Sequence, residues 1–279
     1  MPTIDIAIDP RQPSLLEKKT NTRSGYHRIV FHVGVAGWSI RKEHAHLFGG
    51  EGTHLQRYAS RFAAVEINSS FYQSHKRDTY ERWAKSVPAA FRFAVKAPKF
   101  LTHEACLEEV GEPLAQFVHE IGGLGRKLGC VLVQLPPSLA YEPRTIETFF
   151  AALRARYRGP LVCEPRHPTW FTGAADRRLD AHGVGRVGAD PPCAEDGGVP
   201  AASARVIYFR LHGSPVMYHS RYEADYLDQL SARMQSFRRT PVWCIFDNTA
   251  RGAATINAIE LIAMLSRSRR VVDRERSMV

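Results

Sequence analysis

Charged side chains that could carry out chemistry lie at the ends of several apolar runs in this sequence. Glu66 lies in AAVEI, Lys96 follows FRFAV, Glu164 ends PLVCE, and Arg210 lies in VIYFRL. An isolated charge is costly to bury, so such groups are usually paired, bound to a metal or catalytic. We therefore expect these residues to share one site, and a structural ion-pair network is the alternative interpretation.

Paired carboxylates among cations are suited to acid/base catalysis on an anionic substrate. We assign catalytic roles to Glu66, Glu164, Lys96 and His212. Arginine holds phosphate or carboxylate groups in a forked geometry, and lysine adds a point charge. A lysine buried in a barrel can also form a Schiff base. For Lys96 we expect an ordinary ion pair with Glu66 or Glu164, and the Schiff base is the alternative.

Further polar and aromatic residues lie near the ends of the same runs. Polar residues after strands also serve as helix caps, and aromatic residues also pack the core, so each has a structural alternative. Aromatic and cationic groups on one rim could also stack bases and neutralise phosphates. The expected ligand-binding residues are Trp38, Asn68, Tyr72, His103, Gln134, Arg166, His167, Trp170, Arg210, Asp247 and Asn248.

Metal binding would need several carboxylate and histidine ligands that converge on one point. Six residues could supply such ligands, but no short spacing such as H-E-x-x-H supports them: Glu66, His103, Glu164, His167, His212 and Asp247. We therefore assign no metal ligand and treat a divalent metal as an alternative that is not favoured. No dinucleotide fingerprint, P-loop or Gly-x-Ser-x-Gly elbow is present.

Eight apolar runs must position these residues, and helical patterns lie between most of them. Such short runs, rich in Val, Ile, Phe and Tyr, are typical of buried parallel strands. The alternation predicts a single (β/α)8 barrel of the TIM type, whose active site lies at the carboxyl ends of the strands. An open doubly wound sheet is the structural alternative. The runs begin at Ile29 and continue at 63–67, 91–95, 130–134, 160–164, 184–189, 206–211 and 242–247, with helices expected over 141–157, 222–237 and 252–265.

The 279 residues include 44% apolar residues, which suits one large domain. We expect a loosely ordered extension over 1–28, the barrel over 29–265 and a basic tail over 266–279. The five cysteines show no paired spacing and are expected to be reduced thiols. Without a signal-peptide pattern or a long apolar run, the chain is expected to be cytoplasmic and to have no membrane partner.

Several motifs together resemble the family of domain of unknown function 72, the YecE-like barrels. The matching segments include VGVAGWS, VEINSSFY, QLPPS, CEPRHPTWF, YFRLHG and CIFDNTARGAATINA, and the match extends from about 33 to 262. The resemblance implies the barrel fold. The fold of this family is in turn similar to that of the xylose-isomerase-like barrels. The family often ends its last strand with an Asn pair, whereas this chain has Asp247 followed by Asn248, which adds a carboxylate near the site.

The function expected from these observations is an enzyme that acts on a phosphorylated sugar or nucleic-acid-derived small substrate by carboxylate acid/base chemistry. The formal net charge of +10 favours an anionic partner, although half of it lies in the expected terminal segments. A non-catalytic nucleic-acid-binding protein is one alternative. A metal-dependent phosphodiesterase or isomerase, by analogy with the xylose-isomerase-like barrels, is another. The sequence makes no prediction of the oligomeric state.

Overall fold

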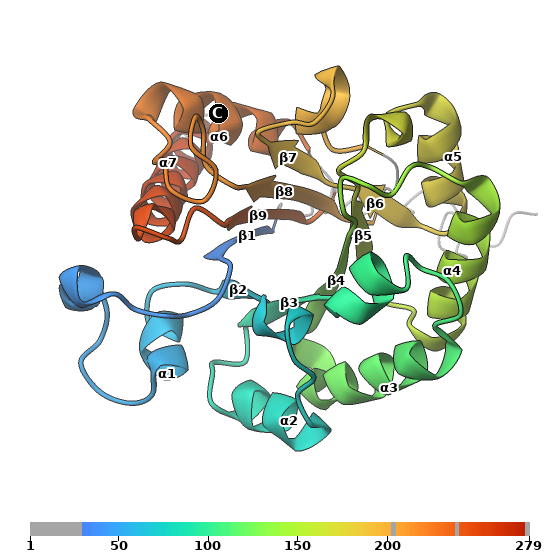
Figure 1. Cartoon of the computed structure of the whole chain (residues 1–279). Helices are drawn as coiled ribbons and strands as arrows, with labels where there is room; N and C mark the ends of the chain where they lie inside the picture. Colours follow the sequence, from blue (N-terminus) through green and yellow to red (C-terminus); the bar gives the residue numbers. More distant parts are fainter. Residues whose placement is uncertain (1–29, 202–204, 238–239, 277–279) are drawn as a thin grey trace, which may run out of the picture.

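Parallel strands lie at the centre of the molecule and helices lie around them (Figure 1). The structure is a computed structural model, and it describes residues 30–201, 205–237 and 240–276. The extension predicted over 1–28 lies outside these described residues. No helix in the described ranges is long and apolar enough to span a membrane.

The described strands form two parallel sheets. One sheet has the order β1 (Phe31–Val35), β9 (Val242–Phe246), β8 (Ile207–Leu211) and β7 (Gly188–Asp190). The other has the order β2 (Ala64–Ile67), β3 (Arg92–Lys96), β4 (Leu128–Gln134), β5 (Leu161–Glu164) and β6 (Val184–Arg186). The predicted parallel α/β fold is confirmed. Closure into one barrel is not seen in the pairing of these strands, which divides between two sheets.

In the described ranges, seven α-helices follow the strands and cover the outer faces of the sheets (Figure 1). Their starts follow local chemistry, since Thr53 and Gln56 form a capping box at α1 and Pro143 occupies the first turn of α4. The helices are α1 (His54–Ala59), α2 (Arg77–Lys85), α3 (Gly111–Ile121), α4 (Pro143–Arg156), α5 (Gly173–Ala181), α6 (Ala224–Ser236) and α7 (Ala253–Arg276). Short helical turns follow five of the strands, at η1 (Lys42–Leu47), η2 (Ser69–Phe71), η3 (Phe100–Glu104), η5 (Pro168–Trp170) and η6 (Glu195–Gly198), and one more, η4 (Gly122–Lys127), connects α3 to β4.

The apolar run at 184–189 is two strands, so its prediction as one strand is wrong. β6 pairs with β5, whereas β7 pairs with β8, and Val187 lies between them. Gly188 allows this change of partner, because a Cβ at this position would lie 2.6 Å from Pro200 Cδ and 2.8 Å from the Gly198 carbonyl oxygen. The chain therefore passes from one sheet to the other within a single residue.

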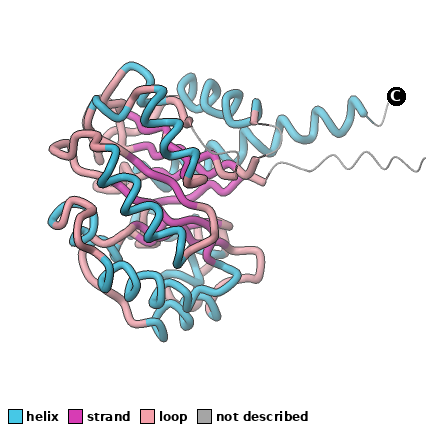
Figure 2. Tube along the Cα trace, turned by 90° about the vertical axis from the view of Figure 1, so that its right-hand side faces the viewer, coloured by secondary structure: helices cyan, strands magenta, loops and turns pink. Residues whose placement is uncertain are grey.

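The last helix also ends later than predicted. The apolar pattern ends at Leu265, but α7 continues to Arg276 and extends beyond the body of the molecule (Figure 2). Apolar periodicity reports only the part of a helix that faces a core. Arginine is a strong helix former, so the segment expected as a tail over 266–279 continues the helix through 276.

The two sheets also lie side by side at β1 and β2. Ala36 and Glu66 form an isolated parallel bridge, and the Gly37 amide donates to the Glu66 carbonyl oxygen at 2.8 Å. Gly34 permits this close approach, since a Cβ there would lie 2.2 Å from the Ala64 carbonyl oxygen. The bridge places the end of β2, with Glu66, beside the end of β1.

Side chains alternate between the outer and inner faces of each strand. In β2, Val65 and Ile67 belong to the large core beneath the helices, whereas Ala64 points to the inner side. The inner side chains at the amino-terminal part of the strands form a second cluster, which we call the inner apolar layer. It consists of Ala64, Ala94, Cys130, Leu132, Val162, Val187, Val206, Tyr208, Trp243 and Ile245. All five cysteines are free thiols, and three of them are buried.

Candidate active site at the strand ends

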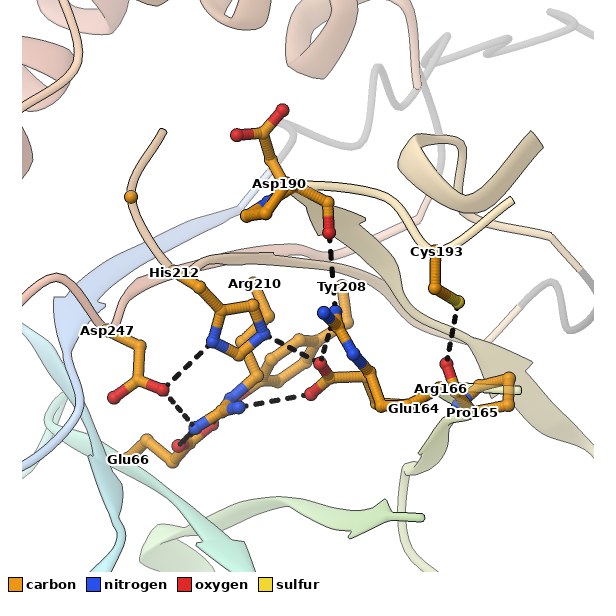
Figure 3. Close-up of polar contacts among 12 residues, drawn as sticks. Glu66, Glu164, Pro165, Arg166, Asp190, Cys193, Tyr208, Arg210, His212 and Asp247 are labelled. Atoms are coloured by element: carbon orange, nitrogen blue, oxygen red, sulfur yellow. Dashed lines mark hydrogen bonds and ion pairs between the residues drawn. The ribbon is translucent and has the colours of Figure 1, made fainter. Parts of the chain in front are cut away.

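Arg210 lies at the centre of a buried cluster of charges (Figure 3). Its guanidinium group contacts Glu66 through Nε and Nη2, with a shortest distance of 2.8 Å. It also contacts Glu164 Oε2 at 3.1 Å and Asp247 Oδ2 at 3.1 Å. Together with His212, these residues form what we call the charged network. Arg210, Glu66 and Glu164 are fully buried.

Strand periodicity positions the charged network directly after the inner apolar layer. Glu66 lies two residues after Ala64, and Glu164 lies two residues after Val162, so each keeps the inward orientation. Arg210 follows Tyr208 in the same way, and the Tyr208 hydroxyl donates to Glu66 Oε2 at 2.9 Å. Parallel strands bring these ends to one side of the molecule, as the sequence predicted.

His212 lies between two carboxylates (Figure 3). Its Nε2 lies 2.7 Å from Glu164 Oε1, and its Nδ1 lies 3.1 Å from Asp247 Oδ2. An ionised carboxylate only accepts hydrogen bonds, so both ring nitrogens must donate. His212 is therefore an imidazolium in this arrangement. Burial alone would lower the pKa of His212, but the two carboxylates outweigh it and raise this pKa above 6.5.

The same contacts lower the pKa values of the carboxylates. Burial would raise the pKa of Glu164, but the charges of His212 and Arg210 hold it far below its ordinary value. The pKa of Asp247 is lowered by Arg210 and His212, again against the effect of burial. Glu164 and Asp247 are therefore ionised at neutral pH. A carboxylate with such a pKa holds cations in place well and donates no proton there.

Lys96 lies next to the charged network but is not paired with it. The side chain is 6% exposed, and Nζ lies 3.8 Å from the centre of the Phe71 ring. No carboxylate of the described residues lies within 4.0 Å of Nζ, so the expected ion pair with Glu66 or Glu164 is wrong. Burial, followed by the charge of Arg210, lowers the pKa of Lys96 to about 8, although nearby carboxylates partly oppose this.

Arg166 and Tyr218 lie at the edge of the charged network. The Arg166 side chain is 13% exposed, and its Nη1 lies 3.5 Å from Glu164 Oε1 and 3.4 Å from the Pro191 carbonyl oxygen. Its other guanidinium nitrogens make no hydrogen bond within the described ranges. Tyr218, which is 45% exposed, has its ring 5.8 Å from His212 in an edge contact.

Four more of the predicted residues lie close to this site. Gln134 pairs in register with Glu164 across β4 and β5, so the two side chains share the inner face. His103 and Tyr72 both make edge contacts with Phe71, the ring that lies under Lys96. The chain turns into η2 at Asn68, whose buried Oδ1 accepts no hydrogen bond from a described residue.

The remaining predicted residues have structural contacts instead. Trp170 is fully buried and its Nε1 donates to the Leu139 carbonyl oxygen at 2.9 Å, so its assignment to the ligand site is wrong. Trp38 packs against Trp83, with ring centres 4.9 Å apart. The His167 ring accepts from the Thr169 amide and so caps the short turn η5.

Asn248 connects two loops and does not join the charged network. Its amide nitrogen donates to the Ser220 carbonyl oxygen at 2.8 Å and to Asn257 Oδ1 at 3.0 Å. Asp247, its neighbour, contacts both Arg210 and His212. The carboxylate at Asp247 is thus the third negative charge of the network.

Sequence analysis did not identify Tyr208 and Tyr218 and did not place Phe71 against Lys96. The pattern could have indicated Tyr208, because two residues of one strand that are two positions apart share a face, and Arg210 was a candidate. Tyr218 lies in a loop, where no periodicity indicates which side chain turns toward the site. Phe71 follows Asn68 within a helical turn, and only the fold places its ring beneath Lys96.

The charged network does not fit a divalent metal ion in this arrangement. A metal would have to lie where the carboxylates of Glu66, Glu164 and Asp247 converge, and the guanidinium group of Arg210 occupies that point. The ring nitrogens of His212 are both engaged with carboxylates. In the described parts of the chain, no group of three or more His, Cys, Asp or Glu side chains is arranged to hold a metal ion.

The curated relatives of the chain are bacterial proteins. The UPF0759 protein YecE of Escherichia coli K12 is 29% identical over 143 residues, which are 48% of this chain and 51% of YecE, so the match spans about half of that relative. The UPF0759 protein YunF of Bacillus subtilis is 22% identical over 275 residues, which are 85% of this chain and 95% of YunF.

Solved structures support the fold. A DUF72 family protein of Thermotoga maritima, TM1631, superposes with a TM-score of 0.70 and 23% identity, over 85% of this chain and 99% of that one. The structure of SacUVDE superposes with a TM-score of 0.52 at 7% identity, over 87% of this chain and 99% of that one, which is a likeness of fold alone. The model of the family "Protein of unknown function DUF72" matches residues 32–278, and the chain belongs to this family.

Proposed function

We propose that the charged network and its edge form the active site of an enzyme that acts on a small anionic substrate. The observation that carries this proposal is the state of Lys96 and Arg166. Both are cations beside a fixed set of carboxylates, and neither spends most of its hydrogen-bond donors on the described residues. Binding of a phosphoryl or carboxylate group requires positioned hydrogen-bond donors that have no acceptor within the protein.

Proton transfer in this site is assigned to Lys96 and His212, which replaces the acid/base role that the sequence assigned to the carboxylates of Glu66 and Glu164. A catalytic acid or base works best when its pKa lies near the operating pH, and the pKa of about 8 at Lys96 meets this condition. His212 carries a proton between two carboxylates and serves as the acid. Glu66 and Glu164 hold Arg210 and His212 in position.

We further propose that the two sheets act as one TIM-type barrel with eight strand positions. Two junctions support this proposal. The Ala36–Glu66 bridge joins β1 to β2, and the β6–β7 segment pairs with β5 at its start and with β8 at its end. Active sites of such barrels lie at the carboxyl ends of the strands, where the charged network is found.

A titration with inorganic pyrophosphate tests the anionic-substrate proposal. We expect pyrophosphate to raise the melting temperature of the natural chain in low salt, because a ligand that binds only the folded state stabilises it. Arg166→Gln should abolish this shift. Arg178→Gln is the matched control, since Arg178 pairs with Glu147 on the outer helices and should leave the shift unchanged. A shift that persists in Arg166→Gln contradicts the proposal.

A single-stranded nucleic-acid-binding protein is the second candidate function. Tyr72 and Tyr218 are exposed aromatic residues beside this site, and aromatic side chains next to cations can stack bases. Binding of a short oligonucleotide would then weaken steeply with salt. If an oligonucleotide binds the natural chain, Lys96→Met and Arg166→Gln both weaken this binding, and pyrophosphate causes no shift, this candidate replaces the enzyme proposal.

A further inference from the structure

Among the described residues, burial lowers the pKa of two lysines, Lys96 and Lys127, and their amines differ in the contacts that they make. Lys127 donates to the carbonyl oxygens of Ala84 and Val87, both at 2.6 Å. Lys96 makes no hydrogen bond within the described residues and lies over the face of Phe71. Lys127 therefore has a structural task, whereas the amine of Lys96 has no hydrogen-bonding partner in the part of the chain that the structure describes and lies at the edge of the charged network.

We propose that Lys96 is a covalent nucleophile that forms an iminium ion with the carbonyl carbon of a small anionic oxo compound. This inference rests on the proposed function, because it uses the same site and the same anionic substrate. A desolvated lysine beside another cation is the environment that activates an amine for such chemistry. Phe71 supplies the apolar surface, and Arg210 supplies the cation.

The step balances without an oxidant or a reductant. The ammonium group of Lys96 first loses a proton, and the lone pair on Nζ attacks the carbonyl carbon while the C=O π electrons move to oxygen. The proton returns to give a carbinolamine, and a second proton transfer lets its oxygen leave as water. The overall reaction converts one ammonium ion and one carbonyl group into one iminium ion and one water molecule.

The surroundings of Lys96 stabilise both the ammonium ion at the start of this reaction and the iminium ion that it forms, because both carry one positive charge. The Phe71 ring attracts an ammonium ion and an iminium ion alike through its negative face. Glu66, Glu164 and Asp247 also act on this charge through space, in the direction that favours a cation. The site therefore holds the iminium ion without needing to reorganise.

Arg166, which contacts Glu164 at the edge of the charged network, indicates the class of substrate. The Nε and Nη2 donors of Arg166 are not used by the described residues, and a guanidinium group binds carboxylate or phosphate in a forked geometry. The substrate is therefore a carbonyl compound that carries one of these groups, either a 2-oxo acid or a phosphorylated aldehyde or ketone.

Reductive trapping with matched probes tests the inference. Glyoxylate and glycolaldehyde are aldehydes of similar size that differ in carrying a carboxylate or a hydroxyl group, and glyceraldehyde 3-phosphate and glyceraldehyde form the phosphorylated pair. The full chain is incubated with each probe and cyanoborohydride at pH 7, and the modified lysines are mapped by peptide mass spectrometry. Lys99, an exposed lysine three residues away that pairs with Glu104, is the internal control.

We expect Lys96 to be modified at least tenfold faster than Lys99 by one of the two anionic probes, and far more slowly by its neutral counterpart. At pH 7, roughly one tenth of an amine with a pKa of about 8 is unprotonated, against about one in 3000 at the ordinary value of 10.5. This difference of a few hundredfold is reduced by the lower nucleophilicity of the weaker base and by burial.

The outcomes separate this inference from the proposed function. If pyrophosphate binds in the Arg166-dependent manner but neither anionic probe modifies Lys96 faster than Lys99, the nucleophile is overturned and the anionic site stands. If Lys96 reacts equally with anionic and neutral probes, the substrate class is overturned. Lys96→Met should lose the selective adduct and Lys99→Met should keep it, while melting curves report the fold of both variants.

Discussion

The inner apolar layer and the charged network lie on the same strands, and their residues are two positions apart on the inward-facing side. Ala64 precedes Glu66, Val162 precedes Glu164, and Tyr208 precedes Arg210, so the same backbone presents either an apolar or a charged side chain to the interior. The apolar layer is stabilised by burial and dispersion, which are spread over many weak contacts. The charged network instead depends on a few contacts, because burying each charge is costly.

The charged network is stable only because its charges are paired. Its three carboxylates contact two cations, Arg210 and the imidazolium of His212, and Arg166 and Lys96 add two more cations at its edge. A loss of volume in the apolar layer leaves a small cavity, whereas a loss of charge in the network leaves an uncompensated ion. The comparison therefore predicts different sensitivities in the two regions.

The largest difference is expected between Arg210→Met and Trp243→Phe. Arg210→Met leaves three buried carboxylates without their shared partner, and we expect the free energy of unfolding to fall by about 5 kcal/mol or to a level at which the chain does not fold. Trp243→Phe, in the apolar layer, should cost about 1–2 kcal/mol. Urea denaturation monitored by circular dichroism measures both. Equal costs would show that the two regions are stabilised alike.

Lys96→Met is expected to raise the free energy of unfolding, whereas the two substitutions above lower it. A folded-state pKa of about 8, against 10.5 in the unfolded chain, costs the folded state roughly 3 kcal/mol at pH 7. Replacing the amine with a thioether of similar length removes this cost and keeps a contact with Phe71, so we expect a gain of about 2 kcal/mol.

This gain should depend on pH. Between pH 8 and 10.5 the unfolded chain binds more protons at Lys96 than the folded chain, so the stability of the natural chain rises toward that of the variant. Urea titrations at pH 7 and pH 10 measure the two gains. Lys99→Met is the matched control, and its exposed position predicts an effect within about 0.5 kcal/mol at both values. An unchanged gain at pH 10 would contradict the assignment.

The arrangement of strands was largely predictable, because buried parallel strands produce distinct apolar runs. The pattern could not predict where the hydrogen bonding between strands breaks and separates them into two sheets. The run at 184–189 continues without interruption in the sequence, but Gly188 meets Pro200, and the partner changes at Val187. Close approaches between distant segments decide such breaks, and they leave no local periodicity.

The members of the site were predictable from position, whereas their roles were not. Glu66, Glu164, Arg210 and His212 were identified because charges at strand ends are rare, and the structure brings all four together. Lys96 was expected to pair with a carboxylate, but its amine lies over Phe71. Arg210, with five donors, lies at the centre instead and contacts all three carboxylates.

The smallest of the expected effects is the pH dependence that His212 confers. Its folded-state pKa is raised above the ordinary value of 6.5, chiefly because Glu164 and Asp247 outweigh burial. This contribution to stability is complete below pH 6.5 and is lost as the pH rises through the folded-state pKa, because the folded chain then holds a proton that the unfolded chain has released. The loss is at most about 1.4 kcal/mol per pH unit. Lys96 acts in the opposite direction only above pH 8, and His32, whose pKa is lowered to about 4, acts only below pH 6.5. We therefore expect the free energy of unfolding of Lys96→Met to fall between pH 6.5 and 8, below the range in which the cysteine thiols, whose folded-state pKa values are raised by burial, begin to titrate in the unfolded chain. The double variant Lys96→Met/His212→Gln should show no such fall. Urea titrations at half-unit intervals measure both slopes. A slope that survives in the double variant would assign the titration to a group outside the charged network.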